Sequence, residues 1–297
     1  MQTITKERFL EIRHQTESIC KSLKPEDVSI QPVEFVSPVK WHLAHTTWFF
    51  EQFVLTVYKE DYKVFNKDFA YYFNSYYNNV GERTVRADRG TMTRPTLDEV
   101  LEYRAYINNQ LSQFISEGIS EQILEVIEIG LQHEQQHQEL LIYDIKYIFG
   151  HQPSFPVLDY SIQLEKENQQ QEFIQIKEGV YEIGHNNEGF CFDNELGRHK
   201  VYLHDFEISN RLVTNAEYIE FIEAGGYKDF NFWHADGWEF IQNNNIELPL
   251  YWYKVDGRWM HYTLQGFVEV QGDLPVSHVT FYEAFAFAQW KGMRLPT

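Results

Sequence analysis

Apolar residues recur every three or four positions along four stretches of the first half of the chain, a spacing typical of helices with one buried face. The stretches are residues 3–24, 37–52, 96–116 and 121–149. The longest contains no proline and is expected to end near Gly150. Thr96 and Glu99 form a capping-box pattern, and Thr3 or Thr5 can cap the first helix. Four helices of this length predict an up-and-down bundle over residues 1–155.

The pattern changes after a polar segment, residues 156–172, which we interpret as a linker. Short alternating runs then predict strands at residues 173–176, 180–184, 199–203 and 206–208. Helices are expected after Thr214 and after Thr280. The Trp- and Tyr-rich region between them is expected to be irregular. The fold class predicted is therefore α plus α+β, with a second domain over residues 173–297.

The composition of the chain disfavours several classes of function. The chain has 25 Lys and Arg against 44 Asp and Glu, a formal charge of -19, which disfavours binding to nucleic acid or anionic membranes. No stretch reaches the roughly 18 apolar residues of a membrane helix, and the N-terminus lacks a signal core. Cys20 and Cys191 fall in different predicted domains and imply no disulfide framework. We expect a cytoplasmic protein, and the sequence points to no particular oligomeric state.

His133 and His137 lie four residues apart on the longest predicted helix, so their imidazoles share one face and can hold one metal ion. The alternative is a pair of polar side chains on a solvated face. His45 falls on the inward face of the second predicted helix and can supply a third ligand. On its own it could equally be a core histidine bonded to a carbonyl. Three histidines suit iron(II) or a zinc-bound water.

Residues 133–137 also satisfy the H-E-x-x-H pattern of zinc proteases, in which Glu134 would activate a metal-bound water. The extended protease pattern fails, because Leu140 stands where a glycine is needed and Tyr143 where a third histidine would fall. A zinc hydrolase is therefore kept only as an alternative.

An aromatic, Asn-rich segment at residues 69–81 is expected to be an ordered loop, and four arginines follow it. They are Arg83, Arg86, Arg89 and Arg94. A guanidinium fork binds a carboxylate through two hydrogen bonds. The alternative for this cluster is a set of weak surface salt bridges.

Three separated motifs resemble the DinB-like domain of the sulfoxide synthases of ergothioneine biosynthesis. They are Trp41-His42-Leu43-Ala44-His45, Phe73-Asn74-Ser75-Tyr76-Tyr77 with the arginines after it, and His133-Glu134-Gln135-Gln136-His137. The second half resembles the formylglycine-generating-enzyme-like domain of the same family, which has a C-type-lectin-like fold. The residues that carry this likeness include Phe192-Asp193-Asn194-Glu195, Asp236-Gly237-Trp238 and Arg294-Leu295-Pro296-Thr297.

The resemblance implies a non-haem iron(II) enzyme that uses O2 to join a thiol to C2 of the hercynine imidazole, giving a sulfoxide. By position, His45, His133 and His137 would bind Fe(2+). Gln136 would contact hercynine. Arg86 and Arg89 would hold the carboxylate of the thiol substrate, which is expected to be cysteine rather than γ-glutamylcysteine. Tyr76 or Tyr77 would be the catalytic proton or hydrogen-bond donor near the iron.

Two related functions stay open within the resemblance, an ovothiol-type and a selenoneine-type synthase. From a different class, a zinc-holding DinB-like protein with a lectin-like binding domain is the alternative. The family pattern continues beyond Arg294-Leu295-Pro296-Thr297. We therefore expect the chain to be incomplete at its C-terminus.

Overall fold

The computed structural model describes residues 4–75, 81–160 and 170–296. The chain divides into two compact units, residues 1–160 and 161–297, and each is described by itself. Within the described ranges, no helix combines the length and apolarity that crossing a bilayer demands.

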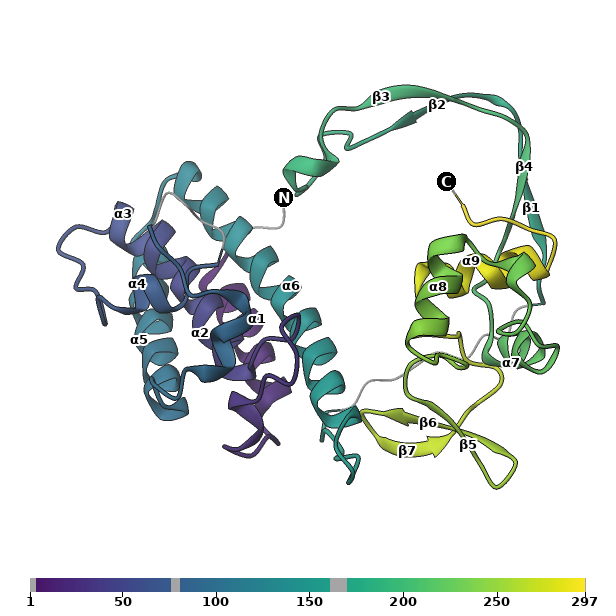
Figure 1. The fold of residues 1–297 in the computed structure, drawn as a ribbon. Helices are drawn as coiled ribbons and strands as arrows, with labels where there is room; N and C mark the ends of the chain where they lie inside the picture. The colour runs from purple at the N-terminus through teal and green to yellow at the C-terminus, as the bar shows by residue number, and fades with distance from the viewer. Residues whose placement is uncertain (1–3, 76–80, 161–169, 297) are drawn as a thin grey trace. The chain divides into compact units, whose positions relative to one another are not determined.

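The first unit is built on four long helices that pack against one another, coloured purple to teal in Figure 1. Their bounds are α1 Lys6–Cys20, α2 Val39–Phe50, α5 Leu97–Ser116 and α6 Glu121–Gly150. The predicted capping box is present, because Thr96 accepts from the backbone of Glu99 and the Glu99 side chain accepts from the backbone of Thr96. Thr5 caps α1. The helical bundle predicted from apolar spacing is confirmed.

Short elements connect these helices. They are the 3-10 helices η1 Asp27–Ser29 and η3 Arg86–Thr91, the π-helix η2 Glu51–Leu55, and the short helices α3 Thr56–Tyr58 and α4 Phe69–Tyr72. The expectation of a loop at residues 69–81 was partly wrong, since α4 occupies its start. Residues 76–80, which include Tyr76 and Tyr77, lie outside the described residues.

Helix α2 is buried along its entire length rather than on one face. Segments outside the bundle cover the remaining side. The indole of Trp48 donates to the carbonyl of Ala70, and the ammonium of Lys40 donates to the carbonyl of Met92 at 3.1 Å. A helix apolar on most sides is expected to be a core helix. The histidines of α2 therefore lie in the interior of the unit.

A close approach brings α2 and η2 against α6. Gly130 of α6 has no side chain, and a Cβ there would lie 2.5 Å from Cε1 of Phe50 and 2.8 Å from Cε1 of Phe49. The ring of Phe49 in turn lies 5.1 Å from that of His133, measured between centroids. The glycine thus allows the packing that sets α2 beside the histidine face of α6.

The second unit contains three small antiparallel sheets and three helices among its described residues. The strands are β1 Phe173–Ile176, β2 Gly179–Ile183, β3 His199–Leu203, β4 Phe206–Ser209, β5 Trp252–Val255, β6 Arg258–Thr263 and β7 Gly266–Glu269. β1 pairs with β4 and β2 with β3, so the two pairs follow each other along one two-stranded ribbon (Figure 1). β5, β6 and β7 form the third sheet. The four strands predicted from alternation are confirmed.

The helices of this unit are α7 Asn215–Glu223, α8 Ala235–Asn243 and α9 Phe281–Trp290, and two 3-10 helices lie at η4 Asp193–Glu195 and η5 Phe230–Phe232. The Trp- and Tyr-rich region predicted to be irregular holds α8 and the β5–β7 sheet, so that prediction was wrong. The alternation of apolar and polar residues that predicts a strand is not visible here, because apolar residues lie on both faces of these short strands.

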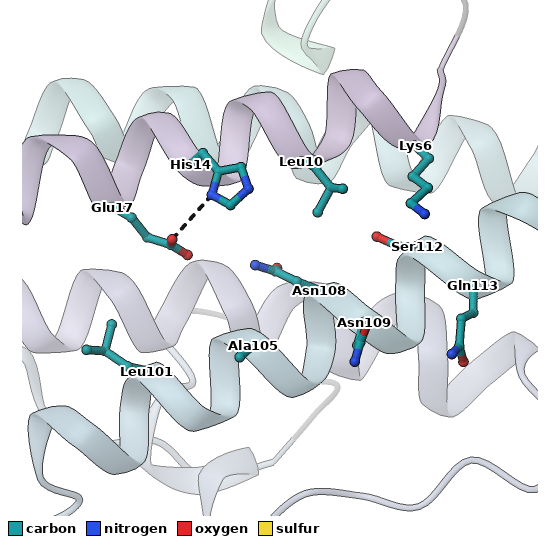
Figure 2. A pocket seen from close by; sticks show the side chains of 10 residues that line it. All are labelled: Lys6, Leu10, His14, Glu17, Leu101, Ala105, Asn108, Asn109, Ser112 and Gln113. Carbon is teal, nitrogen blue, oxygen red and sulfur yellow. Dashed lines mark ion pairs between the residues drawn. The ribbon is translucent and has the colours of Figure 1, made fainter.

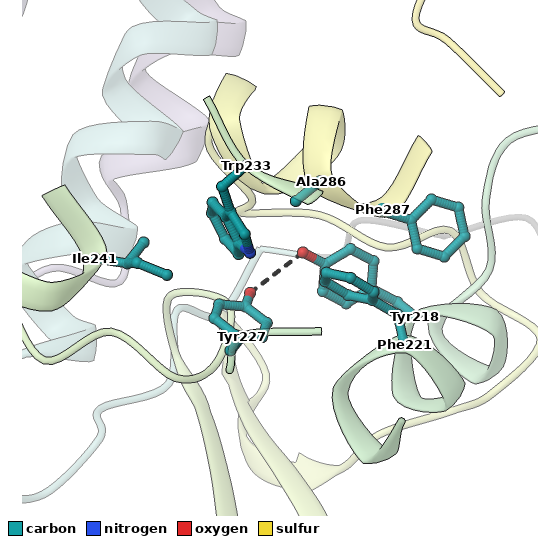
Figure 3. Packing of buried hydrophobic residues seen from close by; sticks show 7 residues of the cluster. All are labelled: Tyr218, Phe221, Tyr227, Trp233, Ile241, Ala286 and Phe287. Carbon is teal, nitrogen blue, oxygen red and sulfur yellow. Dashed lines mark hydrogen bonds between the residues drawn. The ribbon is translucent and has the colours of Figure 1, made fainter. Parts of the chain in front are cut away.

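The core of the second unit gathers around aromatic side chains from α7, α9 and the segment between α7 and α8. Figure 3 shows Tyr218, Phe221, Tyr227, Trp233, Ile241, Ala286 and Phe287. The hydroxyl of Tyr227 donates to the buried carboxylate of Glu283 at 2.5 Å, and the hydroxyls of Tyr218 and Tyr227 lie 3.2 Å apart. Glu283 also completes the capping box of α9 with Thr280. One carboxylate thereby fixes a helix start to the aromatic core.

Candidate metal centre

Three histidines meet between α2 and α6. One possible ligand atom from each of His45, His133 and His137 lies within 4.8 Å of those from the other two. Nitrogens that bind one ion at about 2 Å lie roughly 3–4 Å apart, so small side-chain movements would close this set on a metal. The structure therefore brings together the three residues that the sequence proposed as ligands.

The imidazole of His45 is held on three sides. Its Nδ1 lies 2.6 Å from the carbonyl oxygen of Phe73, so Nδ1 carries a proton and donates it. Its ring stacks on the indole of Trp41, with centroids 4.4 Å apart, and on that of Trp48, with centroids 5.4 Å apart. The contact with Phe73 confirms one of the two sequence interpretations of His45. His45 is a core histidine bonded to a carbonyl, and its Nε2 remains available as a ligand.

His137 makes a different anchoring contact. Its Nδ1 lies 2.8 Å from Nδ1 of His42, and Nε2 of His42 lies 2.9 Å from Oδ2 of Asp144. That oxygen also accepts the backbone N–H of Ser37 at 2.9 Å. His42, His137 and Asp144 are all buried. Nδ1 of His133 is buried and has no hydrogen-bond partner among the described residues.

The environment keeps the three imidazoles neutral. Burial, followed by the proximity of the other histidines, holds the pKa values of His45 and His137 well below the usual value. Burial lowers the pKa of His133 to about 4. Neutral imidazole is the form that binds metal. A buried nitrogen without a partner and three neutral donors on one face therefore fit a metal ion.

Glu134 lies in another part of the interior. Its carboxylate accepts from Arg13 at 2.6 Å, from Arg104 at 3.1 Å and from the hydroxyl of Thr16 at 2.6 Å. Burial alone would raise the pKa of this carboxyl, but the two guanidinium groups and Thr16 lower it to about 2. A carboxylate occupied in this way is not the water-activating base of a zinc protease, which argues against the hydrolase alternative.

The predicted substrate arginines differ in their surroundings. Arg89 is buried, donates to the hydroxyl of Ser37 at 2.8 Å and lies 3.4 Å over the ring of Trp41. Arg86 is exposed, and its side chain donates to the carbonyl of Phe35. Arg89 thus reaches the wall of the histidine site through Trp41, which itself stacks on His45.

The structure says less about the other residues predicted for the site. Gln136 lies on α6 beside His137 with an exposed side chain. Arg83 donates to the carbonyl of Ser75 at 2.8 Å, and Arg94 is exposed. Tyr76 and Tyr77 fall in the part of the chain that the structure does not describe.

A groove of about 550 Å³ lies elsewhere on the bundle, between α1 and α5 (Figure 2). His14 and Glu17, which lie 3.4 Å apart, stand on its α1 side, and Asn108 and Ser112 stand on its α5 side. None of the three histidines of the metal centre lines this groove. It is therefore separate from the candidate metal centre.

Two family models match the chain. Residues 8–141 match the DinB superfamily, and residues 161–297 match the sulfatase-modifying factor enzyme 1-like domain. The two matches follow each other along the chain, one in each compact unit. The match confirms the predicted fold class, a helical DinB domain followed by a sheet-containing domain related to the formylglycine-generating enzyme.

Curated relatives of the two-domain chain include hercynine oxygenases. That of Mycolicibacterium smegmatis is 35% identical over 172 residues, which cover 56% of this chain and 38% of the relative. That of Mycobacterium tuberculosis is 39% identical over 112 residues, 37% of this chain and 26% of the relative. The formylglycine-generating enzyme of Streptomyces coelicolor is 28% identical over 127 residues, 37% of this chain and 38% of the relative. The chain therefore matches less than two fifths of the length of these relatives. The likeness to hercynine oxygenases confirms the resemblance drawn from the sequence.

Sequence reasoning missed the residues that support the site within the DinB domain. His42 was part of a motif but received no role, and the sequence analysis assigned none to Asp144. The available signal was spacing, because Asp144 follows His137 by seven residues, two helical turns, and so lies on the same face. Arg13 and Arg104 gave no such signal, since arginines on amphipathic helices are usually exposed.

Proposed function

We propose that this protein is an iron(II)- and O2-dependent enzyme that forms a C–S bond between a thiol and C2 of the hercynine imidazole, giving a sulfoxide. The observation that carries the proposal is the set of His45, His133 and His137, buried between two helices with neutral imidazoles. Similarity to two proteins named hercynine oxygenase supports the choice of the imidazole substrate.

The reaction balances without another reductant. The thiol loses one hydrogen, the imidazole C2 loses one, and O2 supplies one oxygen to sulfur and one to water. C–S bond formation releases two electrons, sulfur oxidation releases two more, and O2 accepts all four. Iron(II) held by His45, His133 and His137 would supply the activation of O2 for this oxidation.

The protein's own groups would bind and orient the two substrates. Arg86 and Arg89 would hold the carboxylate of the thiol, proposed to be cysteine, through charge-assisted hydrogen bonds. Gln136, exposed beside His137, would contact hercynine. Tyr76 or Tyr77 would donate a proton near the reacting atoms. Without such a donor, the competing product is the sulfinate of the thiol.

A direct test uses the natural full-length protein. Anaerobic titration with iron(II) should give one site per chain, and adding cysteine, hercynine and O2 should give a hercynylcysteine sulfoxide, identified by mass spectrometry. A protein that binds iron but forms no C–S product would contradict the proposal. A product linked at C5 of histidine, or one that contains selenium, would instead indicate an ovothiol-type or selenoneine-type synthase.

Zinc is the second candidate metal, because neutral imidazoles bind it as readily. A zinc-holding binding protein would retain zinc through purification and consume no O2 with thiol and hercynine. Metal analysis of the purified protein, coupled to the product assay, distinguishes the two.

A further inference from the structure

A buried chain of hydrogen bonds leads away from the candidate metal centre. It runs from Nδ1 of His137 to Nδ1 of His42 at 2.8 Å, and from Nε2 of His42 to Oδ2 of Asp144 at 2.9 Å. The relative exposures of His42, His137 and Asp144 are 3%, 7% and 2%. Water therefore has little access to these contacts, and each nitrogen must find its partner within the protein.

If Asp144 is a carboxylate and His42 a neutral imidazole, the hydrogen bonds of this chain allow one tautomer for each ring. An ionised carboxylate only accepts hydrogen bonds, so Nε2 of His42 donates to Asp144. A neutral His42 then has a lone pair on Nδ1, which accepts from Nδ1 of His137. His137 therefore carries its proton on Nδ1 and keeps the lone pair of Nε2 for another partner.

The position of Asp144 is fixed independently of the histidines. Its Oδ2 also accepts the backbone N–H of Ser37 at 2.9 Å, just before α2 begins. The carboxylate thus bridges α6 to the chain segment that leads into α2. The backbone contact holds the acceptor in place, and the acceptor holds His42.

We propose that His42 and Asp144 are positioning residues that fix His137 with Nε2 presented to the metal. The inference rests on the proposed metal site but adds two residues to which the function assigns no role. Metal-binding histidines commonly donate their second ring N–H to a carboxylate or carbonyl, and loss of that partner typically costs about 10–100-fold in metal affinity. Here the imidazole of His42 lies between the carboxylate of Asp144 and the ring of His137, so the carboxylate orients His137 indirectly.

The three histidines differ in what contacts their Nδ1, so the inference applies to His137 in particular. His45 donates to the carbonyl of Phe73, a contact that no side-chain substitution removes. His133 has no partner for Nδ1 among the described residues. Among the described residues, ionisable side chains contact a ring nitrogen of His137 only, of the three proposed ligands. Substitutions at His42 should therefore change His137 and leave the other two imidazoles in place.

The alternative is that His42 and Asp144 only join α2 to α6. A purely structural pair would contribute to the unfolding free energy and leave the metal affinity of the folded protein unchanged. The measurement must therefore report on the metal and on the His137 ring, in proteins shown to be folded.

Cobalt(II) serves as the probe, with the full chain and the variants His42→Leu and His42→Gln. The leucine removes the acceptor for His137, whereas the glutamine can accept through Oε1 and donate through Nε2 to Asp144. We expect cobalt affinity to fall about 10–100-fold in His42→Leu and to stay within about threefold of wild type in His42→Gln. Glu51→Gln is the matched control, since Glu51 is a buried carboxylate of the same domain that accepts from Tyr62 and Tyr103 instead.

Nuclear magnetic resonance of the cobalt form supplies the second readout. The wild type should show exchangeable, strongly shifted N–H signals from His45 and His137. The His137 signal should move or exchange rapidly in His42→Leu and persist in His42→Gln. Wild-type affinity together with wild-type signals in folded His42→Leu would overturn the proposal.

If His42→Leu does not fold, Asp144→Asn provides the test, because it keeps the side-chain shape and removes the charge. A weaker cobalt complex with an altered His137 signal supports the inference, and an unchanged complex refutes it. These outcomes are distinct from failure of the proposed function, in which the wild type itself would bind no metal or, once loaded with iron, form no C–S product.

Discussion

The guanidinium of Arg13 lies 2.6 Å from the carboxylate of Glu134, and both side chains are fully buried. Arg104 and Thr16 complete the set of donors around this carboxylate. The residue that a zinc protease would use as its base is therefore part of a network joining α1, α5 and α6. Its role in this network is to stabilise the bundle that holds the histidines.

We predict that Glu134→Gln destabilises the bundle by about 3–5 kcal/mol at pH 7, because it removes the buried counter-charge of Arg13 and leaves Arg104 paired only with the less buried Glu17. Urea unfolding followed by circular dichroism measures the change. Glu102→Gln, at an exposed position of α5, is the control and should change the unfolding free energy by less than about 0.5 kcal/mol.

The same pair predicts a pH dependence. The pKa of Glu134 falls from 4.5 to about 2 on folding, so its stabilising contribution is complete above the unfolded value and is lost as the pH falls toward 2. The unfolding free energy of the wild type should therefore drop over this interval, and that of Glu134→Gln should drop less. Equal acid dependence in the two proteins would contradict the assignment.

Gly130 gives a second stability prediction. Alanine favours a helix over glycine by about 1 kcal/mol, but its Cβ would meet the rings of Phe49 and Phe50 at 2.8 Å and 2.5 Å. Overpacking of this kind costs about 1–3 kcal/mol. We expect Gly130→Ala to lower the thermal unfolding midpoint, while Gln135→Ala on the exposed face of α6 leaves it nearly unchanged. A stabilised Gly130→Ala protein would show that the rings move aside freely.

Helix positions and the histidine set followed from the sequence because both depend on short-range periodicity. His133 and His137 lie on one helix, and their shared face is fixed by four-residue spacing. His45 could be suggested as a third ligand from its inward position on the second predicted helix, but only the family resemblance assigned it to the same site, because the local pattern does not say which helices face each other. The capping box at Thr96 and Glu99 was visible for the same local reason.

The residues that the sequence did not reveal depend on tertiary contacts. Asp144 and His42 come from different helices, and their pairing exists only once α2 and α6 have packed. Arg13 and Arg104 lie inside because a single buried carboxylate binds both, which reverses the usual preference of arginine for the surface. In the second unit, α8 and the β5–β7 sheet were missed because their aromatic residues show no clean alternation.

Substitution of the arginines proposed to bind the substrate should change substrate binding without changing stability. We predict that Arg86→Leu raises KM for the thiol by roughly 10–100-fold, since a charge-assisted hydrogen bond contributes about 1.5–3 kcal/mol. Because Arg86 is exposed, the unfolding free energy should hardly change. Arg94→Leu, an exposed arginine of the same segment, is the control and should keep the wild-type KM.

Arg89 should respond even to a conservative change. Lysine keeps the charge but lacks the planar fork that bonds to Ser37 and stacks on Trp41. We expect Arg89→Lys to raise KM for the thiol and to weaken metal binding slightly through Trp41 and His45. A wild-type KM in both Arg86→Leu and Arg89→Lys would remove these residues from the substrate site.

The two adjacent tyrosines provide a test of the reaction itself. If one of them donates the proton that directs the reaction toward C–S bond formation, its replacement by phenylalanine should divert the enzyme to thiol dioxygenation. We therefore predict that either Tyr76→Phe or Tyr77→Phe lowers the ratio of sulfoxide to cysteine sulfinate by about 100-fold or more, the lower end of the range typical of loss of a general acid. The other variant serves as the matched control, since it removes the same hydroxyl one residue away. Mass spectrometry of both products at equal O2 consumption measures the ratio, and an unchanged ratio in both variants would show that neither tyrosine is the donor.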